Sequence, residues 1–487
     1  MIYPSKKEFI KLAKKGNLIP VYKEIAADLD TPVSSFLKID EGDYSYLLES
    51  VEGEENMARY SFLGSNPSHI FKSKGRDIEI IENKKARCYK TESDPLAEIK
   101  KFMEQFRFVN IKGLPRFCGG LVGYIGYDMI RFFEDIPDKN PDDLKLPDSI
   151  FVLTDTILIF DHVMHRIKIV SNAHVKGNPS RSYNEAVKKI GRIEKKLLKI
   201  EAANRKPKTV NREVKIKSNF TETSFSKIVR EAKEYIKNGD IIQVVLSQRL
   251  EVNLEKREPF GIYRRLRSIN PSPYMYYLKL KDIKLIGSSP EIMVRCEDKK
   301  IELRPIAGTR PRGKDETEDA KLEKELLADP KEKAEHIMLV DLGRNDVGRV
   351  SDFDSVCVQE LMRIEKYSHV MHIVSDIIGK LSESKSEYDV IRASFPAGTV
   401  TGAPKIRAME IIDELENVKR GPYAGCVGYF SFSGNIDTCI TIRTILVKKD
   451  RAYIQAGAGI VADSEPKREY QETLNKAKAL IKAIEEA

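Results

Sequence analysis

The sequence predicts an α+β or layered α/β fold. Segments with the alternation of a strand and segments with the period of a helix follow one another along all 487 residues. No segment repeats with a fixed short period, and the regular strand–helix alternation of a βαβ barrel is missing. Hydrophobic residues make up 41% of the chain and charged residues 32%, which is typical of a globular protein with a substantial core.

The first half of the chain is expected to be rich in strands. Residues 43–52 (DYSYLLESVE) and 149–170 (SIFVLTDTILIFDHVMHRIKIV) read as strands. The most apolar stretch, residues 149–160, is interrupted by Asp155 and is too short to span a bilayer, and the first residues lack the apolar core of a signal peptide. Six scattered cysteines form no CxxC motif and are expected to be reduced thiols: Cys88, Cys118, Cys296, Cys357, Cys426 and Cys439. We therefore expect a cytoplasmic protein without a membrane segment.

A basic segment carries the whole positive charge of the chain. Residues 188–217 contain twelve Lys or Arg and three Glu, a surplus of nine that equals the formal net charge of +9. A nucleic-acid-binding surface would more often interleave such residues with aromatic side chains, which this segment lacks. We interpret it as a solvated helix followed by a linker, with nucleic-acid binding as the alternative from another functional class. The sequence therefore divides into an expected N-terminal domain of residues 1–205, a basic linker over 203–217 and a second domain of residues 218–487.

Helical and strand-like segments also mix after the linker. Residues 225–240 are expected to form a helix, and residues 241–252 and 437–447 are expected to form strands. Two glycine-rich segments fail as nucleotide-binding motifs. Residues 308–315 (GTRPRGKD) end in Asp where a P-loop needs Ser or Thr, and residues 119–128 lack the GxGxxG order.

Glu332 and Glu335 form the first of two acidic pairs with a spacing of three residues. Asp329 and Pro330 are a favourable helix start, and Glu332 falls at the position that closes a capping box. Glu335 instead falls on the apolar stripe of that helix, where a carboxylate needs a cation or a hydrogen-bond donor. A buried salt bridge with an arginine and a metal ion are both compatible with this pattern.

Glu469 and Glu472 form the second acidic pair, on a helix expected to begin at Ser464. Both lie off the apolar stripe of this helix, about 60° apart around its axis. Taken by itself, Glu472 is expected to pair with Lys476, four residues later, on a solvated face. Periodicity alone therefore does not identify a metal site in this helix.

Three further features bear on chemistry in the second half of the chain. Arg443 lies on an otherwise uncharged face of the expected strand 437–447 and needs a partner, either a protein carboxylate or an anionic ligand. Gly457 and Gly459 either let backbone N–H groups approach an anion or allow close packing. His369 and His372 are either core histidines or, for one of them, a general acid or base near pH 7.

Six segments of the second half together resemble the chorismate-utilising enzymes. They are PIAGTRPRG (305–313), AEHIMLVDLGRNDVGRV (334–350), SHVMHIVS (368–375), FPAGTVTGAPKIRAMEII (395–412), GPYAGCVGYFSFSGNIDTCITIRT (421–444) and IQAGAGIVADSEPKREYQETLNKA (454–477). The N-terminal segments LLES, RYSFLG and GGLVGYIGYD extend the resemblance to nearly the whole chain. It implies a fold of β-sheets packed as a sandwich and flanked by helices.

Two positions favour one branch of this family. Gln243 in QVVLSQR stands where members that add water to chorismate carry a lysine base, and Ala307 in PIAGT stands where aminodeoxychorismate-forming members typically carry a lysine. Both departures favour the anthranilate-forming branch, with aminodeoxychorismate or isochorismate synthesis as the alternatives. The implied reaction adds ammonia at ring C2 of chorismate with loss of the 4-hydroxyl and then eliminates pyruvate. It is the first step of tryptophan biosynthesis.

The resemblance also assigns a metal site. Glu335 and Glu472 resemble the direct ligands of a Mg²⁺ cofactor, and Glu332 and Glu469 resemble their supporting carboxylates. A hard dication with oxygen ligands suits all four side chains. The implied Mg²⁺ would bind the ring carboxylate of chorismate and neutralise charge as the 4-hydroxyl leaves.

Catalytic and substrate-binding roles follow from the same resemblance. His372 resembles the general acid or base, and Thr399 resembles a neighbour that positions this histidine or the substrate. The residues that resemble substrate-binding groups are Gly308, Thr309, Tyr423, Arg443, Gly457, Ala458 and Gly459.

A partner and an inhibitor are implied as well. The chain contains no Cys-His-Glu set typical of a glutaminase, so ammonia is expected from a separate glutamine amidotransferase subunit, in a heterodimer or heterotetramer. Tryptophan is expected as a feedback inhibitor, in a site to which the N-terminal domain contributes. The residues that resemble the tryptophan site are Glu49, Ser50, Pro273, Tyr274 and Met275.

Overall fold

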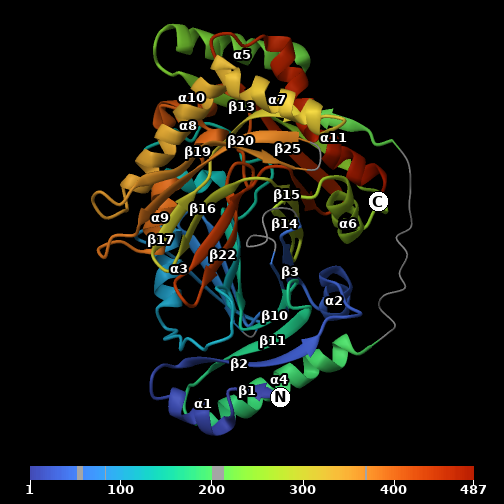
Figure 1. Cartoon of the computed structure of the whole chain (residues 1–487), viewed down its shortest axis with the longest axis vertical. Helices are drawn as coiled ribbons and strands as arrows, with labels where there is room; N and C mark the ends of the chain where they lie inside the picture. The colour runs from blue at the N-terminus through green and yellow to red at the C-terminus, as the bar shows by residue number, and fades with distance from the viewer. Residues whose placement is uncertain (52–58, 83, 200–212, 368–369) are drawn as a thin grey trace.

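Two large antiparallel sheets form the centre of the molecule. The computed structural model describes residues 1–487 except 52–58, 83, 200–212 and 368–369. Within these described residues, sheet A has 13 strands and sheet B has 12. Figure 1 shows the strands between helices at both ends of the long axis.

Sheet A contains strands from the whole length of the chain. Its order is β1 (Ile2–Tyr3), β2 (Leu18–Ala26), β11 (Arg166–His174), β10 (Thr156–Asp161), β4 (Tyr60–Ser65), β3 (Tyr44–Glu49), β14 (Tyr274–Leu280), β15 (Ile283–Ser289), β24 (Thr444–Lys448), β25 (Arg451–Ile460), β13 (Gln243–Asn253) and β12 (Ile216–Ser218), with β21 (Gly402–Ala403) beside β13.

Sheet B is built in the same mixed way. Its order is β18 (Ile306–Pro311), β20 (Val370–Lys380), β17 (Lys300–Leu303), β16 (Ile292–Glu297), β23 (Ile436–Ile440), β22 (Cys426–Ser431), β8 (Gly120–Ile125), β9 (Ser149–Thr154), β5 (His69–Lys74), β6 (Asp77–Glu82) and β7 (Lys85–Lys90), with β19 (Cys357–Lys366) beside β20.

The inner faces of the two sheets pack against each other. A buried cluster combines Tyr46 and Tyr276 of sheet A with Tyr124 of sheet B. Phe62 of β4 meets Tyr429 of β22 edge-to-face, with ring centroids 6.2 Å apart at 68°. Aromatic pairs of this geometry fill the space between sheets well.

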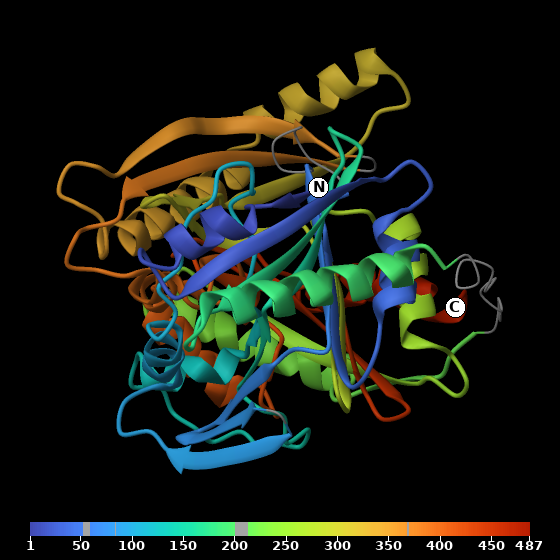
Figure 2. The ribbon, with the colours of Figure 1, turned by 90° about the horizontal axis from the view of Figure 1, so that it is seen from below.

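Helices cover the outer faces of both sheets. The helices are α1 (Lys6–Leu12), α2 (Pro32–Ile39), α3 (Pro95–Met103), α4 (Pro179–Leu197), α5 (Glu222–Lys237), α6 (Pro259–Ile269), α7 (Glu316–Ala328), α8 (Pro330–Gly348), α9 (Glu387–Ser394), α10 (Lys405–Leu415) and α11 (Pro466–Glu485), with 3₁₀ turns η1 (Tyr127–Phe132) and η3 (Gly398–Val400). In Figure 1, α5, α7, α8 and α10 gather at one end of the long axis and α1 and α4 at the other. Figure 2 shows α4, in green, lying across the strands. The layered sandwich flanked by helices is therefore confirmed.

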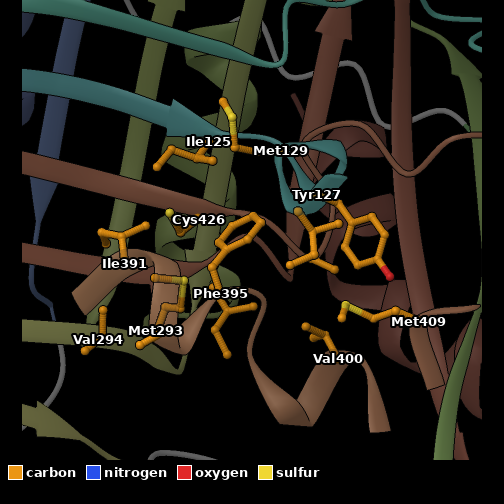
Figure 3. Packing of buried hydrophobic residues seen from close by; sticks show 14 of the residues in the cluster. Ile125, Tyr127, Met129, Met293, Val294, Ile391, Phe395, Val400, Met409 and Cys426 are labelled. Carbon is orange, nitrogen blue, oxygen red and sulfur yellow. The ribbon is translucent and has the colours of Figure 1, made fainter. Parts of the chain in front are cut away.

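Two further hydrophobic clusters attach the helices. One packs α4, α6 and α11 on sheet A, with Ile190 of α4 and Ile484 of α11 fully buried. The other packs α9 and α10 against sheet B and the end of β13. Figure 3 shows part of it, with Met293 of β16, Phe395 next to α9 and Met409 of α10 packed in the interior.

Strands from both sides of the predicted linker share each sheet. β3 pairs with β14 in sheet A, and β8 pairs with β22 in sheet B. Residues 200–212 of the predicted linker 203–217 lie outside the described residues, so the predicted division of the chain into domains stays a prediction.

The basic helix α4 is tied to acidic side chains of its own chain. Lys189 pairs with Asp155 at 2.7 Å, and Lys196 pairs with Glu41 at 2.6 Å. These pairs are what a solvated helix at a protein surface makes. Within the part of the chain that the structure describes, every helix is too short or too polar to cross a membrane.

The strand predicted over residues 437–447 is wrong. β23 ends at Ile440 in sheet B, and β24 begins at Thr444 in sheet A. Arg443 lies between them with a φ of 49°, in the left-handed region, where the chain turns from one sheet to the other. Arg443 therefore lies at a corner and not on the face of a strand.

A second crossing lies beside this corner. Pro290 and Glu291 connect β15 of sheet A with β16 of sheet B. The amide of Ile440 donates to the carbonyl of Glu291 at 3.0 Å, and the amide of Ser288 donates to the carbonyl of Arg443 at 3.1 Å. The two crossings thus bring a carboxyl and a guanidinium group, far apart in the sequence, to neighbouring corners of the sandwich.

Candidate active site

The two acidic pairs lie near the N-terminal ends of α8 and α11. The predicted start of α8 is confirmed: Asp329 is the N-cap and accepts from the amide of Glu332 at 3.3 Å. Glu332 does not close a capping box, because its carboxylate accepts a hydrogen bond from Arg310 at 3.0 Å. The N-cap of α11 is Glu465, which makes no capping hydrogen bond, so the predicted N-cap Ser464 is wrong by one residue.

The carboxylates of the two helices influence one another. Burial raises the pKa of Glu335, and the nearby carboxylates of Glu332 and Glu472 raise it further, whereas the ammonium of Lys476 and the amide of Gln243 lower it. Burial also raises the pKa of Glu469. The side chains of both helices therefore face a common region, although the pairs are more than a hundred residues apart in the sequence.

Lys476 holds this region together. Its ammonium lies 2.7 Å from Glu472 and donates to the carbonyl of Gly457 on β25 at 3.0 Å. The predicted pair of Glu472 and Lys476 is thus confirmed, and the side chain of Glu472 is 46% exposed. The same lysine also joins α11 to the glycine-rich end of β25, so this polar face of the helix borders the strand.

The donor set suits a hard dication in its chemistry. In the described part of the chain, no three acidic, histidine or cysteine side chains converge closely enough to hold a metal ion together. The carboxylate oxygens are nevertheless the ligand type that Mg²⁺ prefers. Burial and like charges raise the pKa of Glu335, which a bound dication would reverse. Lys476 pairs with Glu472, and Arg310 pairs with Glu332.

Two glycines of β25 make room for polar side chains. A Cβ atom at Gly457 would lie 2.7 Å from the hydroxyl of Tyr423, and one at Gly459 would lie 2.6 Å from Nε2 of Gln243. The side chain of Ala458 belongs to the hydrophobic cluster on the other face, so its predicted role can fall only to its backbone.

Arg443 lies close to several of these groups. Its guanidinium donates to the carbonyl of Lys476 at 2.9 Å. Burial lowers the pKa of Arg443, while Tyr423 and Glu472 raise it. A buried guanidinium whose hydrogen bond goes to a carbonyl oxygen retains donors for an anion. The structure therefore brings the predicted residues Arg443, Tyr423 and Gly457 together.

His372 faces the same region from β20. Its Nδ1 lies 3.0 Å from the carbonyl of Gly308 and 3.1 Å from the hydroxyl of Thr309. Gly308 has a φ of 68°, which a residue with a side chain rarely adopts, and this conformation turns its carbonyl toward the histidine. Burial lowers the pKa of His372, and Arg443 lowers it further, so the ring is neutral near pH 7. His369 lies outside the described residues.

Glu291 is the residue that the sequence interpretation missed. It is 7% exposed at the corner beside Arg443, and the hydroxyl of Thr399 donates to it at 2.9 Å. Burial raises the pKa of Glu291 to about 8, while Thr399 and Lys476 lower it. A carboxylic acid that keeps its proton at neutral pH is a candidate proton donor. The only sequence signal is a carboxylate placed directly between two apolar strands.

Gln243, which the sequence analysis used only to distinguish branches of the family, is a second polar group in this region. It is 4% exposed and lies at the start of β13 opposite the glycine-rich end of β25. Its side-chain oxygen has no hydrogen-bond partner among the described residues. An unpaired buried acceptor beside Glu335 indicates a place for a hydrogen-bond donor that is not part of the chain.

A separate pocket collects all five residues predicted for the inhibitor. Glu49, Ser50, Pro273, Tyr274 and Met275 line a cavity with about 600 Å³ of empty space between the sheets. Glu49 is 4% exposed and accepts hydrogen bonds from the phenol of Tyr263 and from Nε of Arg267, the latter at 3.1 Å. The pocket also contains Arg116, Arg295 and Asp437, which the sequence interpretation did not name.

Comparisons with known proteins show the family of the chain. The family model of the chorismate binding enzyme matches residues 43–482. Anthranilate synthase component 1 of Acetivibrio thermocellus is 52% identical over 492 aligned residues, covering 100% of this chain and 99% of that protein, and the one of Aquifex aeolicus is 51% identical, covering 99% and 97%.

Solved structures show the same fold. Anthranilate synthase component I from Streptococcus pneumoniae superimposes with a TM-score of 0.78 at 37% identity, covering 94% of this chain and 99% of that one. The menaquinone-specific isochorismate synthase from Escherichia coli superimposes with a TM-score of 0.72 at 17% identity, covering 99% of both chains, which shows the fold alone.

Proposed function

The chain belongs to the chorismate binding enzyme family and is an anthranilate synthase, and from this premise we propose how its site works. Chorismate is aminated at ring C2 by ammonia, the 4-hydroxyl leaves as water, and loss of pyruvate and of the C2 proton gives anthranilate. One observation carries the proposal. Arg443 and the buried acid Glu291 lie at two neighbouring sheet crossings, and the carboxylates of α8 and α11 lie close to Arg443.

Glu335 and Glu472 would hold Mg²⁺, with Glu332 and Glu469 as supporting carboxylates. Bound there, the ion supplies positive charge for the ring carboxylate of chorismate and for the departing hydroxyl. Arg310 already fixes Glu332 at 3.0 Å, so this carboxylate is oriented without the ion. Lys476 holds Glu472 at 2.7 Å and would give up this contact when the carboxylate turns to the ion.

Arg443 and Tyr423 bind the enolpyruvyl carboxylate in this proposal. The guanidinium is buried and the phenol lies against Gly457, so both donate from the same side of β25. Thr309 adds a hydroxyl, and the backbone of Gly308, Ala458 and Gly459 borders the substrate. A charged, hydrogen-bonded contact of this kind orients the substrate as well as binding it.

Glu291 is the better proton donor and His372 the better acceptor. The raised pKa of about 8 keeps the proton on Glu291 near neutral pH, where it can protonate the departing 4-hydroxyl. The lowered pKa of His372 keeps the ring neutral, and with Nδ1–H donating to Gly308, its Nε2 carries a lone pair. Thr399 then positions Glu291 by its hydroxyl, at 2.9 Å, and not the histidine.

Gln243 supports ammonia as the nucleophile. An amide cannot act as the base that water requires, whereas its unpaired oxygen can accept a hydrogen bond from ammonia, which needs no activation by a base. We propose that a glutamine amidotransferase subunit supplies this ammonia, in a heterodimer or heterotetramer in the cytoplasm. Gln243 and Ala307 both weigh against the aminodeoxychorismate- and isochorismate-forming alternatives.

The pocket around Glu49 is proposed as the site of feedback inhibition by tryptophan. Its carboxylate would accept a hydrogen bond from the amino group of the inhibitor, and Pro273 and Met275 would flank the indole ring. β3 and β14, which carry these residues, pair directly, with Glu49 opposite Met275. β15 follows β14 and leads to the corner of Glu291, which gives a physical link between the pocket and the site.

The activity is tested by mixing the purified chain with chorismate, MgCl₂ and ammonium chloride at mildly alkaline pH. We expect the fluorescence of anthranilate to appear, and its formation to stop when the metal is chelated. Mass analysis of the product distinguishes anthranilate from isochorismate and aminodeoxychorismate. Folded protein that converts chorismate to either of the latter, or that makes no product, would refute the proposal.

A further inference from the structure

A small cavity lies behind Tyr423, on the surface-facing side of the proposed substrate site. It has about 330 Å³ of empty space. Its walls include Tyr423, Thr441, Leu446, Tyr453 and Gln455. A volume of this size accommodates one molecule as small as water or ammonia.

The cavity runs along β25 away from the carboxylates. Gly457, Gln455 and Tyr453 point to the same face of this strand, because side chains alternate along it. The hydroxyl of Tyr423 lies against Gly457 at the inner end, and Tyr453 and Leu144 lie at the outer end. The cavity therefore lies beside Tyr423, whose hydroxyl separates it from the glycine-rich end of β25.

Charged groups frame the outer end. The guanidinium of Arg249 pairs with Asp143, whose side chain is 45% exposed. The ring of Tyr453 lies 5.9 Å from the same guanidinium. The ammonium of Lys448 donates to the carbonyl of Leu144 and fixes this loop over the cavity.

Gln455 leaves one buried acceptor unused in the cavity. Its Nε2 donates to the hydroxyl of Ser247 at 2.8 Å, and that hydroxyl donates to Glu416 at 2.7 Å. Its Oε1 has no hydrogen-bond partner among the described residues, although the residue is only 7% exposed. A buried acceptor without a donor is costly, so this oxygen marks a place for a small donor from outside the chain.

We propose that this cavity is the binding site and access route for neutral ammonia, an inference that rests on the proposed function. The apolar walls formed by Leu446, Leu144 and Pro422 disfavour the ammonium ion and admit the neutral molecule, and the two arginines of the cavity are already paired with carboxylates, which leaves no free carboxylate among them for a cation. Ammonia donates to Oε1 of Gln455 and then passes Tyr423 to the substrate.

Arg420 closes the cavity beside Tyr423 as one half of a neutral ion pair. Arg420 is fully buried and pairs with Glu416 at 2.6 Å, and its guanidinium lies 5.5 Å from the ring of Tyr423. Chorismate, which carries two carboxylates, occupies the other side of Tyr423 in the proposed function. The nucleophile and the anionic substrate thus approach from different sides of one tyrosine.

The test uses substitutions that narrow the cavity or remove its acceptor. Leu446→Phe narrows it, and Leu446→Met keeps its volume and serves as the matched control. Gln455→Leu keeps the size of the side chain and removes Oε1 together with the Nε2 donor to Ser247, and Ser247→Ala, which removes the contact of Nε2 but leaves Oε1 in place, is its control. We expect Gln455→Leu to lower kcat/KM for ammonia by about tenfold, the effect of one lost hydrogen bond, and Leu446→Phe to lower it through the lost space, while KM for chorismate stays within about twofold in both. Leu446→Met is expected to behave like the unsubstituted protein.

Leu144→Phe blocks the outer end from a loop, so it tests the route even where a sheet substitution impairs folding. Circular dichroism establishes which variants are folded. Folded Gln455→Leu and Leu144→Phe variants with unchanged kcat/KM for ammonia would overturn the route and leave the proposed function intact. Absence of anthranilate from the unsubstituted protein would instead refute the function, and the route with it.

Discussion

The proposed catalytic site and the pocket around Glu49 each contain a buried glutamate, but the chain supplies the two with different partners. Glu49 meets a guanidinium at 3.1 Å and a phenol, both from α6. Glu291 meets the hydroxyl of Thr399 and the backbone amide of Ile306 but no guanidinium, and burial raises its pKa to about 8. One carboxyl is held as an acceptor for a ligand, and the other is kept as a proton donor.

The carboxylates of α8 and α11 extend this contrast. Burial and like charges raise the pKa of Glu335, and side-chain cations of the chain hold two of its neighbours. In the proposed function, a bound dication would offset the like charges that raise the pKa of Glu335. The carboxylate of Glu49 is held by two side chains of α6, and the same pocket contains two buried polar atoms without a partner among the described residues, Nε of Arg116 and the hydroxyl of Tyr429. In the proposed function, the carboxylates of α8 and α11 exchange partners when the ion binds, and the pocket around Glu49 receives the inhibitor.

The largest effect is expected when a proposed metal ligand of the catalytic site is replaced. Glu335→Gln or Glu472→Gln removes one proposed ligand charge and should lower kcat by about a hundredfold or more, with little rescue by excess Mg²⁺. Glu325→Gln on α7, an exposed glutamate paired at 3.9 Å with Lys321, is the matched control. Anthranilate fluorescence measures the rates. Full turnover in Glu472→Gln would show that the metal assignment is wrong.

The next effect concerns the proton donor. Glu291→Gln keeps the size and polarity of the side chain and removes its proton, so we expect kcat to fall by about a hundredfold with KM for chorismate little changed. At saturating ammonia, kcat of the unsubstituted enzyme should fall as the pH rises through about 8, because Glu291 then loses its proton. A pH profile of the Gln variant that keeps this descending limb would contradict the assignment.

A smaller effect is expected for the pocket around Glu49, where a substitution should change inhibition but not catalysis. Glu49→Gln should raise the tryptophan concentration for half-inhibition by about tenfold, since a hydrogen bond to a charged acceptor is replaced by one to a neutral acceptor. The rate without tryptophan should stay unchanged. Inhibition curves of this variant and of the surface control Glu41→Gln provide the comparison. Equal inhibition of both variants would place the inhibitor elsewhere.

The smallest effect tests the space beside β25. Gly457→Ala puts a Cβ 2.7 Å from the hydroxyl of Tyr423, which has to move, so KM for chorismate should rise several-fold. Gly261→Ala on α6, where the nearest atom would be 3.8 Å away, is the control. An unchanged KM in a folded Gly457→Ala variant would place the substrate away from Tyr423.

The sequence predicted the fold class, and it named several residues that the structure brings together; the gaps have physical reasons. The start of α8 at Asp329 was predictable because capping depends on local chemistry. Arg443 was misplaced because an alternating pattern does not reveal where a strand leaves one sheet for another. Glu291 was missed for the same reason, since its burial depends on the packing of two sheets.

The periodicity of the sequence also could not predict which residues from distant segments lie close together. The helical period predicts only that Glu472 forms a surface ion pair with Lys476, whereas the folded chain also places it near Glu335. Before the structure was known, only the resemblance to a family connected these two glutamates. The cavity at Gln455 has no pattern in the sequence, because an unpaired oxygen is visible only when its surroundings are known.

Mn²⁺ binding followed by electron paramagnetic resonance tests the central claim most directly, because it reports the metal and not the turnover. Mn²⁺ replaces Mg²⁺ at oxygen sites. We predict one bound Mn²⁺ per chain in the presence of chorismate, its loss in both Glu335→Gln and Glu472→Gln, and its retention in Glu49→Gln. Retention of the bound ion in both catalytic variants would contradict a shared metal site of α8 and α11.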